Sequence, residues 1–195
     1  MPKSFAVIEM GVAQPPRVDL LCHSSTPTDL VRRLSATAHR NAHILSISFQ
    51  LDAAMDCIRV PKPTAPRMTI GLWEHTCFEA FVTVPGSPAY RELNLSPSSE
   101  WAVFAFQSYR EIAPFPENLT APEITLHRGD NSLQLEATVN LDELSPAFEQ
   151  AELHVGLSAV IEDVEGSLSY WALRHPAAYA DFHHADARVL CIPGV

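Results

Sequence analysis

The sequence has few basic residues. Lys and Arg number 13 among 195 residues, against 23 Asp and Glu, which gives a formal net charge of −10. No run of basic residues interrupts this acidic balance. A protein that binds nucleic acid or an anionic membrane surface needs clustered positive charge. The composition therefore argues against nucleic acid and membranes as main partners.

Closely spaced cysteine pairs and long apolar runs are also missing. The four cysteines, Cys22, Cys57, Cys77 and Cys191, are widely scattered, which is typical of buried thiols in a reducing compartment rather than of a disulfide framework. No apolar run approaches the ~18 residues of a membrane span, and the first residues lack the ~7 to 15 apolar residues of a secretory signal. We therefore expect a cytoplasmic protein.

Apolar and polar residues alternate with a period of two along much of the chain. Residues 34–38 and 45–51 follow this pattern, and residues 40–43 read as the turn of a hairpin between them. A helix over residues 28–39 is an alternative for the first run. Residues 61–66 hold three prolines and are expected to form a loop.

Further strand-like runs follow, separated by turn signals every ~8 to 12 residues. They cover residues 76–84, 90–95, 100–106, 123–128, 132–140, 152–161, 167–173 and 188–192, with one helical turn at 141–144. Short strands joined by close turns are typical of an antiparallel sandwich. We predict an all-β fold, an antiparallel two-sheet β-sandwich of the immunoglobulin or jelly-roll kind, forming one domain over residues 1–195.

Polar residues occupy strand positions after the proline-rich loop, where a core strand would carry apolar ones. Glu79, Glu92 and Asn94 alternate with apolar neighbours, so their side chains can gather on one face of a sheet. Trp73 and Trp101 flank them in the sequence. An aromatic platform beside hydrogen-bonding groups suits a small polar ligand, above all a sugar.

Four segments carry a resemblance to a known family. The chain resembles the DOMON-like superfamily of β-sandwich modules, and more closely its bacterial branch related to carbohydrate-binding module family 9, at LWEHTCFEAFV, ELNLSPSSEWAVFAF, SAVIEDVEGSLSYWAL and DFHHADARVLCI. The motifs come in the same order and span nearly the whole chain. The resemblance implies a sandwich of two antiparallel sheets with a pocket for a sugar or for haem on one sheet.

Sugar-binding members of that superfamily use two tryptophans as a clamp, with acidic and amide side chains on the sugar hydroxyls. By this resemblance Trp73 and Trp171 would form the clamp, and Glu79 and Asn94 would be the polar partners. The chemistry is sound, because sugar C–H faces stack on electron-rich rings and carboxylates accept hydrogen bonds from vicinal hydroxyls.

A polar and aromatic stretch between the last two expected strands supplies further candidates. Arg174 and His175 are candidate ligand contacts, because loops at sandwich ends often carry binding residues. The alternative is that residues 176–181 only pack over the edge of the sheet.

Together these features predict a non-enzymatic module that binds a small polar ligand, with a carbohydrate as the leading candidate and no metal or cofactor. A homo-oligomer is compatible with the sequence, and so is a scaffold that binds no small ligand. The expected ligand-binding residues are Trp73, Glu79, Glu92, Asn94, Trp171, Arg174 and His175.

Haem and hydrolysis remain alternative functions. Haem would take Met68 with His175, His183 or His184 as axial ligands. A hydrolase could use Glu79 with Glu92 as paired carboxylates.

The same residue types leave three further chemical interpretations open. Cys77 could act as a nucleophile with a histidine base. His75 and Cys77 could join His183 and His184 in a zinc site. Asp163 and Asp181 could join a structural calcium site.

Overall fold

Thirteen strands build the fold in the computed structural model, which describes residues 16–114 and 119–195. Residues 1–15, where the sequence predicts no secretory signal, lie outside the described part. The strands are β1 (Val18–Cys22), β2 (Val31–Asn41), β3 (Ile44–Ala53), β4 (Arg67–Met68), β5 (Cys77–Thr83), β6 (Tyr90–Leu95), β7 (Glu100–Ser108), β8 (Glu111–Ala113), β9 (Glu123–Arg128), β10 (Ser132–Asn140), β11 (Leu153–Glu162), β12 (Leu168–Ala172) and β13 (Leu190–Ile192).

The helical elements are short. They are α1 (Leu141–Leu144) and the 3-10 turns η1 (Leu72–Glu74), η2 (Pro146–Phe148) and η3 (Ala185–Ala187). Within residues 16–114 and 119–195, no helix combines the length and the apolar character that crossing a membrane requires.

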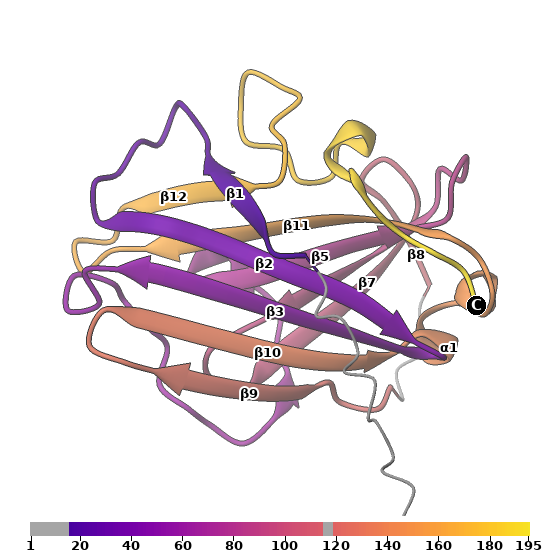
Figure 1. Ribbon diagram of the computed structural model, residues 1–195, viewed down its shortest axis with the longest axis horizontal. Coiled ribbons are helices and arrows are strands. Elements are labelled where there is room, and N and C mark those ends of the chain that lie inside the picture. Colours follow the sequence, from indigo (N-terminus) through magenta and orange to yellow (C-terminus); the bar gives the residue numbers. More distant parts are fainter. Residues whose placement is uncertain (1–15, 115–118) are drawn as a thin grey trace, which may run out of the picture.

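The strands form one continuous, curled sheet in the order β4-β7-β6-β5-β11-β12-β1-β2-β3-β10-β9, with β13 on β11 and β8 on β7 (Figure 1). The all-β prediction is confirmed. The prediction of two separate antiparallel sheets is not confirmed, because β1 pairs with both β2 and β12 and so joins the two halves. In addition, β4 runs parallel to β7.

The main hydrophobic core lies between the two halves of this sheet. In Figure 1 the half that contains β2, β3, β10 and β9 lies in front of β5, β7 and β11. Phe49 on β3 and Phe78 on β5 meet across the core with ring centroids 5.0 Å apart, and neither ring is exposed. Burial of such large apolar side chains is the dominant stabilising contribution.

Most of the predicted elements are present with similar bounds. The hairpin of β2 and β3 is confirmed, and the alternative of a helix over residues 28–39 is wrong, because β2 pairs along its length with β3. The strands β6, β9 and β10 and the helical turn α1 begin and end where the sequence predicts. The strands β1, β4 and β8 were not predicted. They have two to five residues, too few for a clear alternation.

The strand β5 is buried along all of its seven residues. Phe78, Ala80 and Val82 point into the main core, whereas Cys77 and Phe81 on the other face belong to two small apolar clusters. A strand that is covered on both faces needs a second layer above the sheet. The turn η1 and the segment after β12 (residues 173–189) supply residues to that layer, and the candidate site lies beneath them.

We expect Phe49→Ala to lower the free energy of unfolding by about 3–5 kcal/mol, because it removes a fully buried ring and leaves a cavity beside Phe78. Urea unfolding followed by circular dichroism would measure this. Ile70→Ala is a suitable control, because Ile70 is exposed and its replacement should change the stability by no more than about 0.5 kcal/mol. Equal losses in the two variants would contradict the placement of the core.

Candidate functional site

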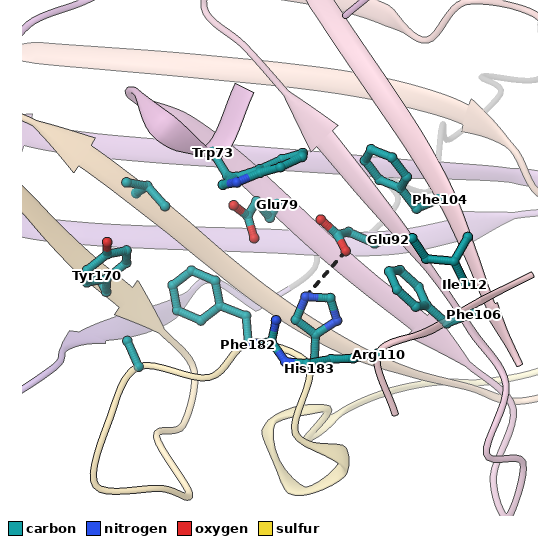
Figure 2. A pocket seen from close by; sticks show the side chains of 12 residues that line it. Trp73, Glu79, Glu92, Phe104, Phe106, Arg110, Ile112, Tyr170, Phe182 and His183 are labelled. Atoms are coloured by element: carbon teal, nitrogen blue, oxygen red, sulfur yellow. Dashed lines mark ion pairs between the residues drawn. The ribbon is translucent and has the colours of Figure 1, made fainter. Parts of the chain in front are cut away.

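A cavity of about 400 Å³ lies on the outer face of the sheet half that contains β5, β6, β7 and β11 (Figure 2). Its size falls within the range of roughly 300–1,000 Å³ that small-molecule sites occupy. The floor comes from β5 and β6, and the walls come from η1, from β7, β8 and β12, and from the segment after β12. Side chains far apart in the sequence therefore meet around one space.

Two carboxylates form the floor. Glu79 on β5 and Glu92 on β6 are 3% and 6% exposed, and Figure 2 shows both carboxylates directed into the space below Trp73. Glu79 lies opposite Asn94 in the strand register, so Glu92, two residues away from Asn94, is its diagonal neighbour.

The two carboxylates differ in their partners. The fully buried amide of Asn94 donates a hydrogen bond of 2.8 Å to Oε1 of Glu92. Among the described residues, none donates a hydrogen bond to Glu79, and only burial and the charge of Glu92 act on its pKa. A buried carboxylate that lacks donors is costly, and such groups are uncommon in proteins. Glu79 is therefore a group that a ligand could satisfy.

Burial shifts the acid–base equilibria of the floor. Loss of hydration, followed by repulsion from Glu92, raises the pKa of Glu79 well above its ordinary value. Loss of hydration also raises the pKa of Glu92, and the hydrogen bond from Asn94 and the charge of Arg110 oppose this. Two coupled carboxyls of this kind hold a proton to a higher pH than isolated ones do.

His183 lies beside Glu92, with Nε2 of its imidazole 3.6 Å from Oε2 of the carboxylate. Burial, with the charges of Arg110 and Arg188, lowers the pKa of His183 to about 4, although Asp181 opposes this. The imidazole is therefore neutral near pH 7, and its contact with Glu92 is not a pair of full charges.

Tyr90 holds this imidazole at its other nitrogen. The hydroxyl of Tyr90 accepts a hydrogen bond of 3.1 Å from the backbone N–H of Arg110 and lies 2.9 Å from Nδ1 of His183. When the hydroxyl donates to Nδ1, the imidazole proton is on Nε2 and faces Glu92.

Charged groups hold the segment after β12 against the sheet. Arg110 donates a hydrogen bond of 3.0 Å to the buried carboxylate of Asp181, and the hydroxyl of Tyr109 donates another of 2.9 Å. The guanidinium of Arg188 lies 4.6 Å from the ring centroid of Tyr90 and donates to the carbonyl of His183 at 3.1 Å. The positive charge of Arg110 is thus largely matched by Asp181.

Aromatic rings form the walls. Trp73 on η1 packs edge-on against Phe104, with centroids 5.8 Å apart, and is itself 37% exposed. Tyr170 and Phe182 meet on the other side, with centroids 6.1 Å apart (Figure 2). Phe106 and Ile112 extend the wall along β7 and β8. Such walls offer stacking surfaces around a polar floor.

The structure brings together some of the candidate residues and separates others. Trp73, Glu79 and Glu92 line the cavity, whereas Asn94 lies beneath it and acts through Glu92.

Trp171 does not reach the cavity, and the predicted clamp with Trp73 does not form. Trp171 lies in the main core, 7% exposed, and its indole N–H donates to Ser169 at 3.0 Å. The reason is strand alternation: Trp171 is opposite Ala159 on the core face, so the neighbouring pair of Tyr170 and Val160 faces the cavity. Trp101 is also a core residue.

Arg174 and His175 also lie outside the cavity lining. The side chain of Arg174 is exposed. His175 lies 2.8 Å from the carbonyl of Leu21 and packs edge-on against His23, with ring centroids 4.8 Å apart. These contacts tie the segment after β12 to β1, so the role of His175 in the structure is to position that segment.

The cavity lining also contains residues that the sequence did not predict as ligand contacts, namely Tyr170, Phe182 and Arg110. His183 was considered only as a haem or zinc ligand. Alternation along β12 could have indicated Tyr170, because Trp171 and Tyr170 must point to opposite faces. Nothing in the sequence indicates how the irregular segment carrying Phe182 folds back over β5.

The zinc interpretation of His75 and Cys77 does not fit the geometry. His75 caps the end of η1 and bonds to Glu162 at 2.8 Å. Cys77 is fully buried beneath Asn94, and burial raises the pKa of its thiol well above the ordinary value. A thiol of this kind is a poor nucleophile or metal ligand. Nδ1 of His184 accepts from the backbone N–H of Asp186.

The haem and calcium interpretations lack assembled ligands as well. Met68 is exposed on β4 and does not line the cavity, so it cannot face His183 across it. Asp163 accepts hydrogen bonds from the backbone of its own turn, and Asp181 pairs with Arg110.

One group of metal-ligand types lies elsewhere in the described chain. Ligand atoms of Glu152, His154 and Cys191 lie within 4.8 Å of one another at the junction of β11 and β13. Glu152 and Cys191 are exposed, and an ordinary surface contact of 3.2 Å between Glu152 and His154 accounts for much of the arrangement.

Comparisons with known proteins identify the fold. No family model matches the chain, and no curated protein does. A protein from Bacteroides uniformis ATCC 8492, described as a candidate carbohydrate-binding protein, is similar with a TM-score of 0.69 and 11% identity, over 91% of this chain and 85% of that one.

A family 9 carbohydrate-binding module from Caldicellulosiruptor kristjanssonii is also similar. Its complex with cellotriose has a TM-score of 0.60 and 7% identity, over 92% of this chain and 82% of that one. Its complex with glucose has a TM-score of 0.54 and 8% identity, over 90% and 83%. At these identities the likeness shows a shared fold.

Glu79→Gln should stabilise the ligand-free protein, and the gain should grow with pH. The raised pKa means that folded Glu79 keeps a proton which the unfolded chain releases above about pH 4.5, so wild-type stability falls as the pH rises through that window. Gln does not titrate. We therefore expect the gain to be smallest at pH 4 and to increase toward pH 8.

Urea unfolding at several pH values would measure this difference. Glu74→Gln is the matched control, because Glu74 is exposed on η1 and does not line the cavity. A gain for Glu79→Gln that does not change between pH 4 and pH 8 would contradict the buried state of this carboxyl.

Proposed function

We propose that this chain is a non-catalytic module that binds a small carbohydrate in the cavity beneath Trp73. The observation that carries the proposal is the unpartnered, buried carboxylate of Glu79, which faces a cavity with aromatic walls. Sugar hydroxyls would donate to Glu79 and Glu92, and a C–H face of the ring would stack on Trp73.

The shape and exposure of the site support this proposal. Trp73 is the most exposed of the three tryptophans, all of which lie in the described part of the chain, so its ring is accessible from solvent. The fold is shared with a module whose solved complexes hold glucose and cellotriose. We further propose that the chain belongs to the DOMON-like superfamily near carbohydrate-binding module family 9, with the curled sheet as its form of the sandwich.

A second candidate function is glycoside hydrolysis, which the coupled carboxyls of Glu79 and Glu92 favour. A carboxyl that keeps its proton near pH 7 can serve as a general acid. However, both side chains rise from adjoining strands of one floor, whereas the two carboxylates of a glycosidase flank the bond that is cleaved. Turnover of nitrophenyl glycosides that disappears in Glu79→Gln would establish hydrolysis in place of simple binding.

Trp73→Ala should weaken sugar binding at least tenfold, because it removes the stacking surface, and tenfold corresponds to about 1.4 kcal/mol. Isothermal titration calorimetry against a panel of neutral, amino and N-acetylated mono- and disaccharides would measure it.

Trp171→Phe is the matched control for this experiment. It should lower the stability through loss of core packing and leave the dissociation constant within about twofold. If the folded wild-type protein binds nothing in the panel, the proposed function is wrong. If Trp171→Phe weakens binding as strongly as Trp73→Ala does, the location of the site is wrong.

A further inference from the structure

The positive charge in the cavity lining is limited to Arg110. Glu79 and Glu92 are the acidic groups of the floor, and His183 is neutral near pH 7. Arg110 is the one cationic side chain in the lining, and it bonds to Asp181. Among the described residues, no hydrogen bond joins Arg110 to either floor carboxylate. Arg110 therefore acts on Glu92 through its charge alone, and no cation of the described chain acts on Glu79.

The unsatisfied group lies at one defined point of the floor. Glu92 accepts from Asn94 and lies beside Nε2 of His183, whereas Glu79 has no hydrogen-bond donor in the described structure. A neutral hydroxyl offers one donor and no charge. An ammonium offers three donors and a full positive charge, so it would satisfy Glu79 and also relieve its repulsion from Glu92.

The walls suit the same kind of group. Trp73, Phe104, Tyr170 and Phe182 surround the carboxylates with the faces and edges of aromatic rings (Figure 2). Aromatic faces attract cations, with tryptophan the strongest, and aromatic cages with acidic floors recognise ammonium groups. A sugar ring and an ammonium on that ring could thus use the same walls.

We propose that the sugar bound in this cavity carries a free, protonated amino group, which lies between Glu79 and Glu92. This inference rests on the proposed function and narrows its ligand to amino sugars of the hexosamine type, in preference to neutral or N-acetylated ones. N-acetylation removes the charge and adds bulk, so the acetylated sugar would lack the interaction with the carboxylates.

Binding of an ammonium group should change the protonation of the two floor carboxyls. Burial and mutual repulsion raise the pKa of these carboxyls, and an ammonium beside them would lower it again, so binding should release a proton to solvent. The charged and titratable groups around the pair are Cys77, Tyr90, Arg110, Tyr170 and His183, and Asp181 and Arg188 act on His183. The pKa of His183 is lowered to about 4 and burial raises the pKa values of Cys77 and Tyr90, so the released proton would come from the carboxyl pair.

The test is calorimetric titration of the wild-type protein at pH 7 with glucosamine, glucose and N-acetylglucosamine. We expect glucosamine to bind at least tenfold more tightly than the other two. Titration in buffers of different ionisation enthalpy should show net proton release with glucosamine and none with glucose. Glu79→Gln should reduce the preference for glucosamine to less than threefold, and the Glu74→Gln control should leave it unchanged.

The outcomes separate this inference from the proposed function. Glucose or N-acetylglucosamine that binds as tightly as glucosamine would overturn the amino-sugar inference and leave the binding of carbohydrate intact. Failure of all three sugars, and of the wider panel, would overturn both. If cyclohexylammonium binds as tightly as glucosamine, the cavity recognises the ammonium group and not the sugar ring. That result would overturn the inference that the ligand is an amino sugar. If Glu79→Gln does not fold, the affinities of the wild-type protein for the three sugars still test the preference for glucosamine.

Discussion

The burial of polar side chains on the second face of β5 and β6 is the constraint on which the cavity depends. The first face of these strands packs into the main core, and the turn η1 and the segment after β12 cover much of the second. Polar groups in such a place must find partners inside the protein. Asn94, Tyr90 and His183 do so, and Glu79 does not within the described chain. The chemistry of the floor follows from this difference.

The cover over the sheet, which consists of η1 and the segment after β12, is held in place by side-chain interactions rather than by regular secondary structure. Arg110 lies at a turn with a φ of 57°, which is uncommon for a residue other than glycine. There its backbone N–H bonds to Tyr90 and its guanidinium bonds to Asp181. Arg188 contacts the ring of Tyr90 from the end of η3. Tyr90 therefore contacts both the β7–β8 turn and the cover, and it orients His183 toward Glu92.

The period-two alternation of apolar and polar residues is enough to locate most of the strands in the sequence. It correctly locates the β2–β3 and β9–β10 hairpins, and it places Glu79 and Glu92 on one face of neighbouring strands. The same rule shows why the tryptophan clamp was wrong. The expected strand over 167–173 was right, but which face each residue takes depends on pairing, and Trp171 pairs on the core side. The residues that complete the cavity come from an irregular segment whose path depends on long-range contacts of Asp181 and Arg188, and local sequence carries no signal for those.

The same arrangement explains how a floor that destabilises the free protein can favour a ligand. A nearly buried carboxylate without protein donors lowers the stability of the ligand-free state. A ligand that supplies donors or positive charge removes this unfavourable contribution, so part of the binding free energy comes from relief of strain already present. Selection among ligands would then depend less on the aromatic walls, which accept many rings, than on the charge and the donors presented to Glu79. Fold likeness to sugar-binding modules does not fix those features, because they depend on individual side chains of the floor.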